Sequence, residues 1–286
     1  MALPENFDLD EFVWRVLRED LGDGGDVTSA ATIGEEQNFT AEMNARQAMV
    51  VAGLDLAAAF FRRLDPDVRV EMLAADGDRI EHGRPVIRLE GKARAMLAAE
   101  RAALNSLQHL SGIATLARDY VDAIEGTGAI LLDTRKTVPG LRVLEKYAAR
   151  MGGAHNHRMR LDDGVLIKDN HVAVCGGVAE AVRRAKAANT GLQVQVEVDR
   201  VDQIEPALSA GADRLLLDNM PPHVLREAVA LVRGRVPLEA SGGVTMETIR
   251  TIAQTGVNYI SVGRITQSAP AVDIGLDYSL VTVERQ

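Results

Sequence analysis

The sequence contains a single cysteine and few aromatic residues. Cys175 has no second cysteine to pair with, so an internal disulfide is excluded. Its expected role is that of a small buried apolar residue, and a catalytic thiol is the lesser alternative. Aromatic residues make up only 3% of the 286 positions, so the core must consist mostly of Ala, Val, Leu and Ile. This composition is typical of layered helices and strands.

The chain also lacks a basic excess and any long apolar run. Its formal net charge of −9 argues against binding to nucleic acid or to anionic membranes, because both need a basic face. No apolar run reaches the ~20 residues of a membrane-spanning helix. The first dozen residues have neither the basic nor the apolar region of a signal peptide. We therefore expect a soluble, cytoplasmic protein with no nucleic-acid or membrane partner.

The N-terminal third predicts a helix and an antiparallel sheet with helices on one face. An amphipathic helix is expected over residues 8–21, and the GDGGD run after it fits a turn better than a calcium loop. A second helix is expected at 54–64. The expected strands are 38–45, 48–52, 68–74 and 85–90. The tail, at 271–283, predicts one more strand that rejoins this sheet.

A long helix is expected from about Arg94 to Ile124, with an apolar stripe of Ala and Leu at helical spacing. Arg101, Asn105 and Gln108 fall on its opposite face. That face is either solvated or in contact with another subunit. Trp14, the only tryptophan, lies off the main apolar stripe of the first helix and is a second candidate for a subunit contact.

From residue 129 onward, short apolar strands alternate with helices. This rhythm predicts a parallel sheet buried on both faces, in an open doubly wound or a barrel-like array. No GxGxxG follows the first strand, which weakens a dinucleotide-binding interpretation. The expected strands are 129–133, 165–168, 192–198, 214–218, 237–240 and 259–263, and the expected helices are 141–151, 177–188, 201–210, 222–233 and 245–255.

Polar residues stand at the C-terminal ends of these strands, where α/β barrels carry their sites. They are Asp133, Thr134, Arg135, Lys136, Lys168, Glu197, Asp218, Ser241, Gly242, Gly243, Gly263 and Arg264. The two glycine segments fit phosphate cradles, in which backbone N–H groups and a following helix N-terminus meet the oxygens. Glu197 and Asp218 are either ion-pair partners of the nearby cations, ligands of Mg²⁺, or acceptors for ribose hydroxyls.

The cations Arg135, Lys136, His157, Arg158 and Lys168 gather within one segment of an otherwise acidic chain. Such a cluster destabilises a protein unless an anion fills it. Arginine recognises carboxylates with two parallel hydrogen bonds, whereas lysine supplies a point charge. The set therefore predicts a substrate with carboxylates beside one with phosphates. Among the histidines, we expect His157 to bind substrate and His155 and His171 to be structural.

The sequence resembles the quinolinate phosphoribosyltransferase family over nearly its whole length. The segments that carry the resemblance are EDLGDGGDVTS (19–29), ERAALNSLQHLSGIAT (100–115), DTRKTVPGLRVLEKYA (133–148), GGAHNHR (152–158), LIKDNH (166–171), VEVD (196–199), LLLDNM (215–220), EASGGV (239–244) and ISVGRIT (260–266). The resemblance implies an N-terminal open-faced α/β sandwich and an incomplete TIM-like barrel of six or seven strands. Residues 1–113 with 268–286 would form the first domain, and residues 114–267 the second, catalytic one.

The resemblance also implies an activity: transfer of phosphoribosyl from phosphoribosyl pyrophosphate (PRPP) to quinolinate with loss of CO₂. The product would be nicotinate mononucleotide, in the de novo route to NAD. A homodimer is implied, with Arg101 reaching the neighbouring site. Quinolinate would meet Arg101, Thr134, Arg135, Lys136, His157, Arg158 and Lys168. PRPP would meet Lys136, Lys168, Glu197, Asp218, Ser241, Gly242, Gly243, Gly263 and Arg264, with Mg²⁺ at Glu197 and Asp218.

Two other functions stay open on the sequence alone. One is a phosphoribosyltransferase of the same fold that acts on another pyridine or related substrate. The other is a catalytically silent anion sensor, which would have no need of Glu197 or Asp218. Arg160 departs from the family pattern, which has a small residue at that position in many members, and it adds a cation near the expected site.

Overall fold

A computed structural model describes residues 7–279, and they form two compact units. Unit 1 contains residues 7–116, 143–152 and 268–279, and unit 2 contains residues 117–142 and 153–267. The division falls close to the boundary expected after residue 113. However, residues 143–152, which we assigned to the second domain, belong to unit 1.

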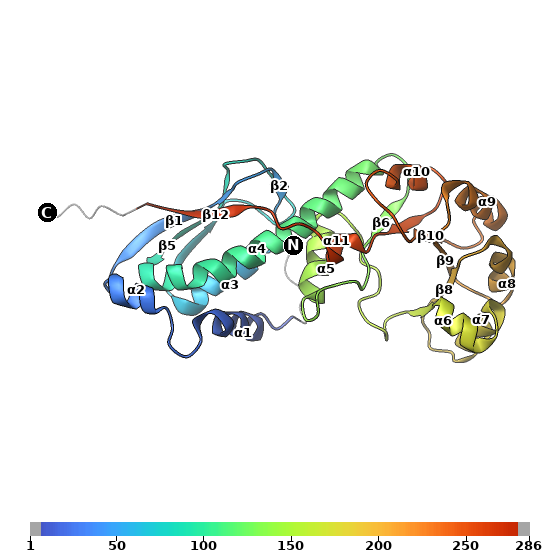
Figure 1. Cartoon of the computed structure of the whole chain (residues 1–286), viewed down its shortest axis with the longest axis horizontal. Coiled ribbons are helices and arrows are strands. Elements are labelled where there is room, and N and C mark those ends of the chain that lie inside the picture. Colours follow the sequence, from blue (N-terminus) through green and yellow to red (C-terminus); the bar gives the residue numbers. More distant parts are fainter. Residues whose placement is uncertain (1–6, 280–286) are drawn as a thin grey trace. The chain divides into compact units, whose positions relative to one another are not determined.

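Unit 1 is built on an antiparallel sheet of four strands in the order β12-β1-β5-β3. Alternate side chains of β1, from Phe39 to Ala45, are buried, and those between them are more open. Helices α3 and α4 lie beside the apolar face (Figure 1). The bounds are α1 (Leu9–Leu21), α2 (Val27–Thr32), β1 (Asn38–Ala45), β2 (Met49–Val50), α3 (Leu54–Leu64), β3 (Arg69–Met72), β4 (Arg79–Ile80), β5 (Pro85–Lys92), α4 (Ala93–Ala123) and β12 (Ile274–Ser279). The predicted sheet with helices on one face is confirmed, except that the strand expected at 48–52 pairs with β4 in a separate two-stranded sheet.

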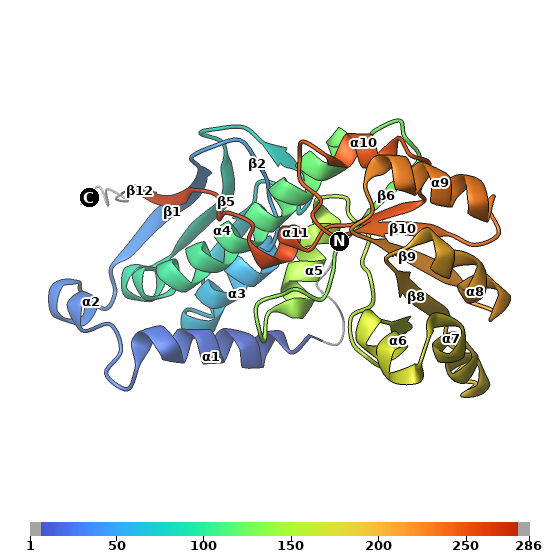
Figure 2. The same cartoon turned by 45° about the vertical axis from the view of Figure 1, so that its right-hand side comes forward.

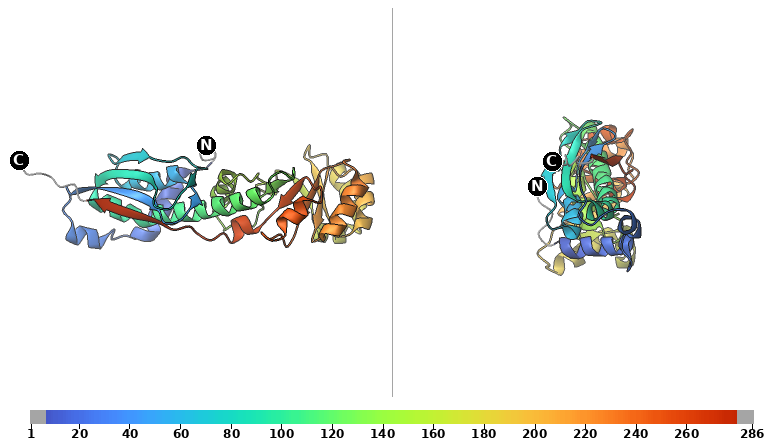
Figure 3. Two further views of the ribbon diagram at one scale, coloured as in Figure 1. Left: turned by 90° about the horizontal axis from the view of Figure 1, so that it is seen from above. Right: turned by 90° about the vertical axis from the view of Figure 1, so that its left-hand side faces the viewer.

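The C-terminal strand returns to the N-terminal half of the chain. β12 pairs antiparallel with β1 and places Ile274 opposite Ala45 (Figure 3). The predicted tail strand is thus confirmed over residues 274–279. Residues 271–273, also predicted as strand, precede it as coil, and 280–283 lie outside the described residues. Gln108 on α4 donates its amide Nε2 to the carbonyl of Ile274 at 2.8 Å. The expectation that Gln108 faces solvent or another subunit is therefore wrong.

Helix α5 (Arg142–Met151) explains why residues 143–152 belong to unit 1. It is buried on nearly every side, and two of its polar residues have partners in that unit. The hydroxyl of Tyr147 donates to the carboxylate of Asp76 at 2.5 Å. The buried carboxylate of Glu145 lies 2.9 Å from the His109 Nε2. A helix that comes between two unit 2 segments in sequence is thus bound by hydrogen bonds inside unit 1.

Unit 2 contains a six-stranded parallel sheet in the order β6-β11-β10-β9-β8-β7. All six predicted strands are present, and the first strand in sequence lies beside the last. The bounds are β6 (Ile130–Leu132), β7 (Val165–Ile167), α6 (Asp169–Cys175), α7 (Val178–Ala187), β8 (Val194–Val198), a 3₁₀ turn (Val201–Gln203), α8 (Ile204–Ser209), β9 (Arg214–Asp218), α9 (Pro222–Val232), β10 (Leu238–Ser241), α10 (Ile249–Ala253), β11 (Tyr259–Ser261) and α11 (Arg264–Gln267).

The two faces of this sheet differ in chemistry. Helices α7, α8 and α9 follow the outer side of strands β8–β10 (Figure 2), and apolar residues alternate with polar ones along β8 and β10. In the strand register, Glu197 and Glu239 lie opposite Leu216, and Ser241 lies opposite Asp218. Polar side chains therefore share one face across neighbouring strands. The expected burial extends to polar residues of this second face, since Gln195 and Glu239 are buried there.

Three smaller features of the described residues bear on the sequence predictions. Trp14 is 44% exposed, and the Arg63 guanidinium carbon lies 5.1 Å from its ring centroid. Cys175 is half-buried rather than buried. Within residues 7–279, no helix has the length and apolar character needed to cross a membrane.

Candidate active site

A cavity of about 690 Å³ lies at the C-terminal ends of the parallel strands. Every predicted site residue except Arg101 lines it: Thr134, Arg135, Lys136, His157, Arg158, Lys168, Glu197, Asp218, Ser241, Gly242, Gly243, Gly263 and Arg264. All of them belong to unit 2. Arg101 is exposed on α4, in the part of that helix assigned to unit 1.

The strand order explains why distant segments meet in this cavity. Because β6 pairs with β11, the segment after β6 lies beside Gly263. A Cβ at Gly263 would lie 2.7 Å from Cδ of Lys136, so a larger residue there would displace that side chain. The Thr266 hydroxyl donates to the carbonyl of Lys136 at 2.7 Å, and the Lys136 N–H donates to the Thr134 hydroxyl at 3.1 Å.

The fully buried carboxylate of Asp133 holds the segment that carries His157 and Arg158. It accepts the backbone N–H of His157 at 2.8 Å and the side-chain amide of Asn156 at 2.5 Å. Leu132 and His155 form an isolated parallel bridge. The strand-end aspartate therefore fixes a loop that is 24 positions away in sequence.

Two arginines on this side of the cavity have no carboxylate partner among the described residues. The buried Nε of Arg135 has no hydrogen-bond partner there, and the guanidinium of Arg158 donates only to the Gly164 carbonyl, at 3.0 Å. Burial, followed by the charge of Arg135, lowers the pKa of Arg158. Two close guanidinium groups with spare donors fit a ligand that has more than one carboxylate.

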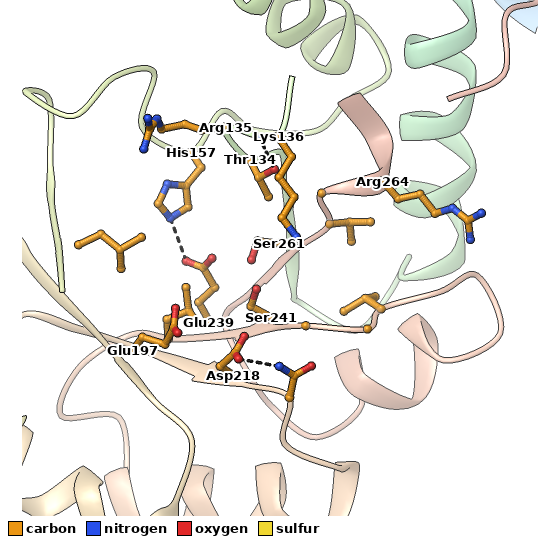
Figure 4. A pocket seen from close by; sticks show the side chains of 18 of the residues that line it. Thr134, Arg135, Lys136, His157, Glu197, Asp218, Glu239, Ser241, Ser261 and Arg264 are labelled. Atoms are coloured by element: carbon orange, nitrogen blue, oxygen red, sulfur yellow. Dashed lines mark hydrogen bonds and ion pairs between the residues drawn. The ribbon is translucent and has the colours of Figure 1, made fainter. Parts of the chain in front are cut away.

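The opposite side carries the carboxylates and the glycines (Figure 4). Glu197 is nearly buried and forms a short ion pair with the ammonium of Lys168. Asp218, at the end of β9, accepts a hydrogen bond from Asn219 Nδ2 at 2.6 Å. Gly242 and Gly243 adopt left-handed φ values of 90° and 60°. This side thus presents oxygen acceptors beside an open backbone.

The predicted helix N-termini behind the glycine segments are only partly present. The helix expected over 245–255 begins at Ile249, so it does not follow Gly243 directly. Only the four-residue α11 starts immediately after Gly263. The side chain of Arg264 points away from the labelled carboxylates in Figure 4. A helix of more than one turn therefore follows neither glycine segment directly, and what this side presents is open backbone.

Sequence reasoning missed Glu239, which lies at the floor of the cavity. Its carboxylate is fully buried and lies 2.7 Å from the Arg214 guanidinium, 2.8 Å from the Gln195 amide and 3.4 Å from the His157 Nε2. Burial alone would raise its pKa, but His157 and Arg214 together lower the pKa of Glu239 to about 2. The available signal was a glutamate inside a short apolar strand, where an unpaired charge is very costly.

The histidines separate into different environments. The Nδ1 of His157 accepts the backbone N–H of Arg158 at 2.8 Å while its Nε2 faces Glu239, so both ring nitrogens already have protein partners. His171 Nδ1 accepts the N–H of Lys168 at 2.9 Å at the start of α6, which confirms a structural role. Arg160 is exposed and bonds to Asp162 at 2.8 Å, outside the cavity.

Fold and geometry together define an α/β protein with a strand-end cavity for a small, highly charged anion. Residues 26–111 match the N-terminal domain, and residues 113–277 the C-terminal domain, of the family described as quinolinate phosphoribosyl transferase. The chain belongs to this family.

Individual relatives are similar along most of their length. A Bacillus subtilis (strain 168) protein named probable nicotinate-nucleotide pyrophosphorylase [carboxylating] is 43% identical, over 92% of this chain and 90% of the relative. A Nicotiana glauca protein named quinolinate phosphoribosyltransferase [decarboxylating] 2, mitochondrial, is 40% identical, over 94% and 82%. The crystal structure of nicotinate-nucleotide pyrophosphorylase from Ehrlichia chaffeensis aligns with a TM-score of 0.92 at 39% identity, over 96% of this chain and 100% of that one.

Proposed function

We propose that this chain transfers the phosphoribosyl group of PRPP to quinolinate and releases pyrophosphate and CO₂, giving nicotinate mononucleotide for NAD biosynthesis. Family membership and the relatives' names support this function. The observation that carries it is the pair Arg135 and Arg158, two close guanidinium groups without a carboxylate partner in the described chain. A pyridine dicarboxylate supplies the missing negative charge.

The residue roles follow from the two sides of the cavity. Arg135 and Arg158 hold the quinolinate carboxylates beside Thr134, and His157 lines the same wall. Lys136 and Lys168 lie between this substrate and the pyrophosphate. Backbone N–H groups at Ser241, Gly242, Gly243 and Gly263 hold the 5′-phosphate, and Arg264 adds charge at the rim.

The chemistry needs no protein nucleophile. The pyridine nitrogen attacks C1 of the ribose, and the C1–O bond to pyrophosphate breaks through an oxocarbenium-like state. The positive ring nitrogen then stabilises the electron pair left when the 2-carboxylate departs as CO₂, and a proton from solvent takes its place. The protein contributes positioning and charge neutralisation.

Magnesium belongs to the same proposal. Glu197 and Asp218 are two carboxylates on one face of the sheet, and no group of three metal-ligating side chains occurs among residues 7–279. That donor set fits an ion bound by one or two carboxylates, water and substrate phosphates rather than a protein cage. The ion would neutralise the pyrophosphate as it leaves, and the same carboxylates would bind the ribose hydroxyls.

Three finer points complete the proposal. A curved, incomplete barrel is supported by the strand order, in which the first strand of the unit, β6, lies beside the last, β11, while β6 and β7 end the sheet and do not pair with each other. A homodimer is supported by Arg101, which is exposed on α4 and has a charge suited to a substrate carboxylate in a neighbouring site. A cytoplasmic location remains a prediction from the sequence.

The test is to incubate the purified protein with quinolinate, PRPP and Mg²⁺ and to follow nicotinate mononucleotide and CO₂, with nicotinate in a parallel reaction. We expect product in the reaction with quinolinate and none in the reaction with nicotinate. EDTA should abolish the product until Mg²⁺ is restored in excess. Turnover of nicotinate instead would overturn the substrate. Binding of both substrates without product would indicate the anion sensor.

A further inference from the structure

Asn219 links the two ligand-binding elements on the carboxylate side of the cavity. It directly follows Asp218 at the end of β9 and lines the cavity itself. Its side-chain Nδ2 donates to Oδ2 of Asp218 at 2.6 Å, the dashed line drawn from Asp218 in Figure 4. Its backbone N–H donates to the carbonyl of Ser241 at 2.8 Å. Asn219 therefore contacts both the Asp218 carboxylate and the segment that carries the glycines.

The amide of Asn219 also restricts which residue fits at position 242. A Cβ added to Gly242 would lie 2.2 Å from the Asn219 Oδ1 and 2.5 Å from its Cγ. Real Cβ atoms do not approach other atoms so closely. Gly242 additionally has a φ of 90°, where L side chains are strained. The Asn219 side chain thus adds to two backbone features that already favour glycine at position 242: its φ, and the Asn219 backbone nitrogen 2.9 Å from the added Cβ.

The backbone conformation of Asn219 also favours asparagine at this position. Its φ of 53° is left-handed, a conformation that costs most residues energy and is tolerated best by Gly and Asn. Asn is the residue that combines this backbone with a side-chain amide able to donate to Asp218. The strained position is therefore occupied by a residue whose side chain has a specific partner.

We propose that Asn219 is a positioning residue that holds the Asp218 carboxylate and the Ser241–Gly243 backbone in register for the two ends of PRPP. Asn219 fixes one oxygen of Asp218 and leaves the other free for the ribose hydroxyls or a metal ion. It holds the glycine segment in the left-handed form that exposes its N–H groups to the 5′-phosphate. The inference rests on the proposed function, because it assigns PRPP to this side.

The decisive variant is Asn219→Gly, which keeps the left-handed backbone and removes only the amide. The matched control is Asn189→Gly, because Asn189 also has a left-handed φ, of 47°, and lies outside the main cavity. The measurement is calorimetric titration with PRPP and Mg²⁺, without quinolinate. We expect about a tenfold weaker Kd for Asn219→Gly, the loss typical of one hydrogen bond to a charged group, and a Kd within twofold of wild type for Asn189→Gly.

Steady-state kinetics separates positioning from a general loss of structure. For Asn219→Gly we expect KM for PRPP to rise while KM for quinolinate and the melting temperature stay near wild type. Equal changes in both KM values, or a PRPP Kd within twofold of wild type, would overturn the assignment. Wild-type protein that binds PRPP but does not use quinolinate would refute the proposed reaction alone. Wild-type protein that does not bind PRPP would refute both.

A double-mutant cycle tests the fit between the two positions. Gly242→Ala should weaken PRPP binding strongly in the wild type, since the new methyl group meets the Asn219 amide. In the Asn219→Gly background the same substitution should cost less, because the Oδ1 and Cγ atoms are gone. Independent, multiplicative losses would contradict the proposed contact.

Discussion

The two sides of the cavity handle charge in opposite ways. On the side of Arg135 and Arg158, the cations lack ion-pair partners among the described residues, and Asp163 offsets only part of the burial and repulsion that lower the pKa of Arg158. On the opposite side and at the floor, each carboxylate has a protein donor: Lys168 for Glu197, Asn219 for Asp218, and Arg214 for Glu239. The carboxylates are therefore neutralised within the protein, whereas the charges of Arg135 and Arg158 are left for a negatively charged substrate to neutralise.

The largest expected effect comes from removing a cation on the uncompensated side. Arg135→Ala should lower kcat/KM for quinolinate by about 10²–10³-fold, the loss typical of truncating one partner of a buried charge pair. Arg135→Lys keeps the charge but not the paired donors, so it should recover only part of the loss. Steady-state kinetics at saturating PRPP measures kcat/KM for quinolinate in both variants. Near-normal rates in Arg135→Ala would remove the carboxylate clamp from the mechanism.

The second-largest effect is expected at the floor of the cavity, where Arg214 compensates the buried charge of Glu239. Glu239→Gln leaves the Arg214 charge without its partner, so we expect the free energy of unfolding to fall by about 3 kcal/mol. Urea denaturation at pH 7 measures it. The surface variant Glu205→Gln, which removes one partner of an exposed pair with Arg235, should change stability far less and serves as control. Equal effects in the two variants would contradict the role given to burial.

The same carboxylate predicts a pH dependence. The pKa of Glu239 is lowered to about 2 from an ordinary value of 4.5, so its ionised form favours the folded state. Its contribution is complete above pH 4.5 and is lost as the pH falls towards 2. At ~1.4 kcal/mol for each pKa unit, the loss amounts to about 3 kcal/mol. Urea titrations between pH 5 and 2 should show a shallower fall for Glu239→Gln than for the wild type, and parallel curves would refute this assignment.

The smallest effect is expected at Arg160. Its side chain is exposed and bonded to Asp162, so it lies outside the cavity although Arg158 is two positions away. Arg160→Ala should leave kcat/KM within about twofold of wild type, as is usual for an exposed pair. Arg158→Ala, assayed beside it, should lose most of the activity. A comparable loss in Arg160→Ala would extend the cationic side beyond the cavity.

The fold was largely predictable because its signals are local. Short Val- and Leu-rich strands between helices indicated the parallel sheet, and the polar residues that end them indicated the cavity edge. The parts of the fold that the sequence did not predict depend on contacts between residues far apart in sequence. Tyr147 and Glu145 tie α5 to unit 1 through Asp76 and His109, and nothing near α5 in sequence reveals either contact.

The site shows the same division between local and distant signals. Spacing indicated which cations and glycines share a strand end. It did not indicate that Glu239, Arg214 and His157 form one cluster, because those residues come from β10, β9 and the loop after α5. The role of Asn219 was hidden for another reason. Its left-handed backbone and its contact with Gly242 exist only after β9 and β10 pair.

The most direct test of the central claim measures stability with and without substrate in Arg135→Met, which keeps the length and apolar part of the side chain without its charge. Without ligand, the variant should unfold at the same temperature as the wild type or higher, because one of two repelling cations is gone. With saturating quinolinate, the wild type should gain more stability than the variant. A variant that is less stable without ligand and equally stabilised by quinolinate would show that Arg135 is a structural residue and would contradict the account.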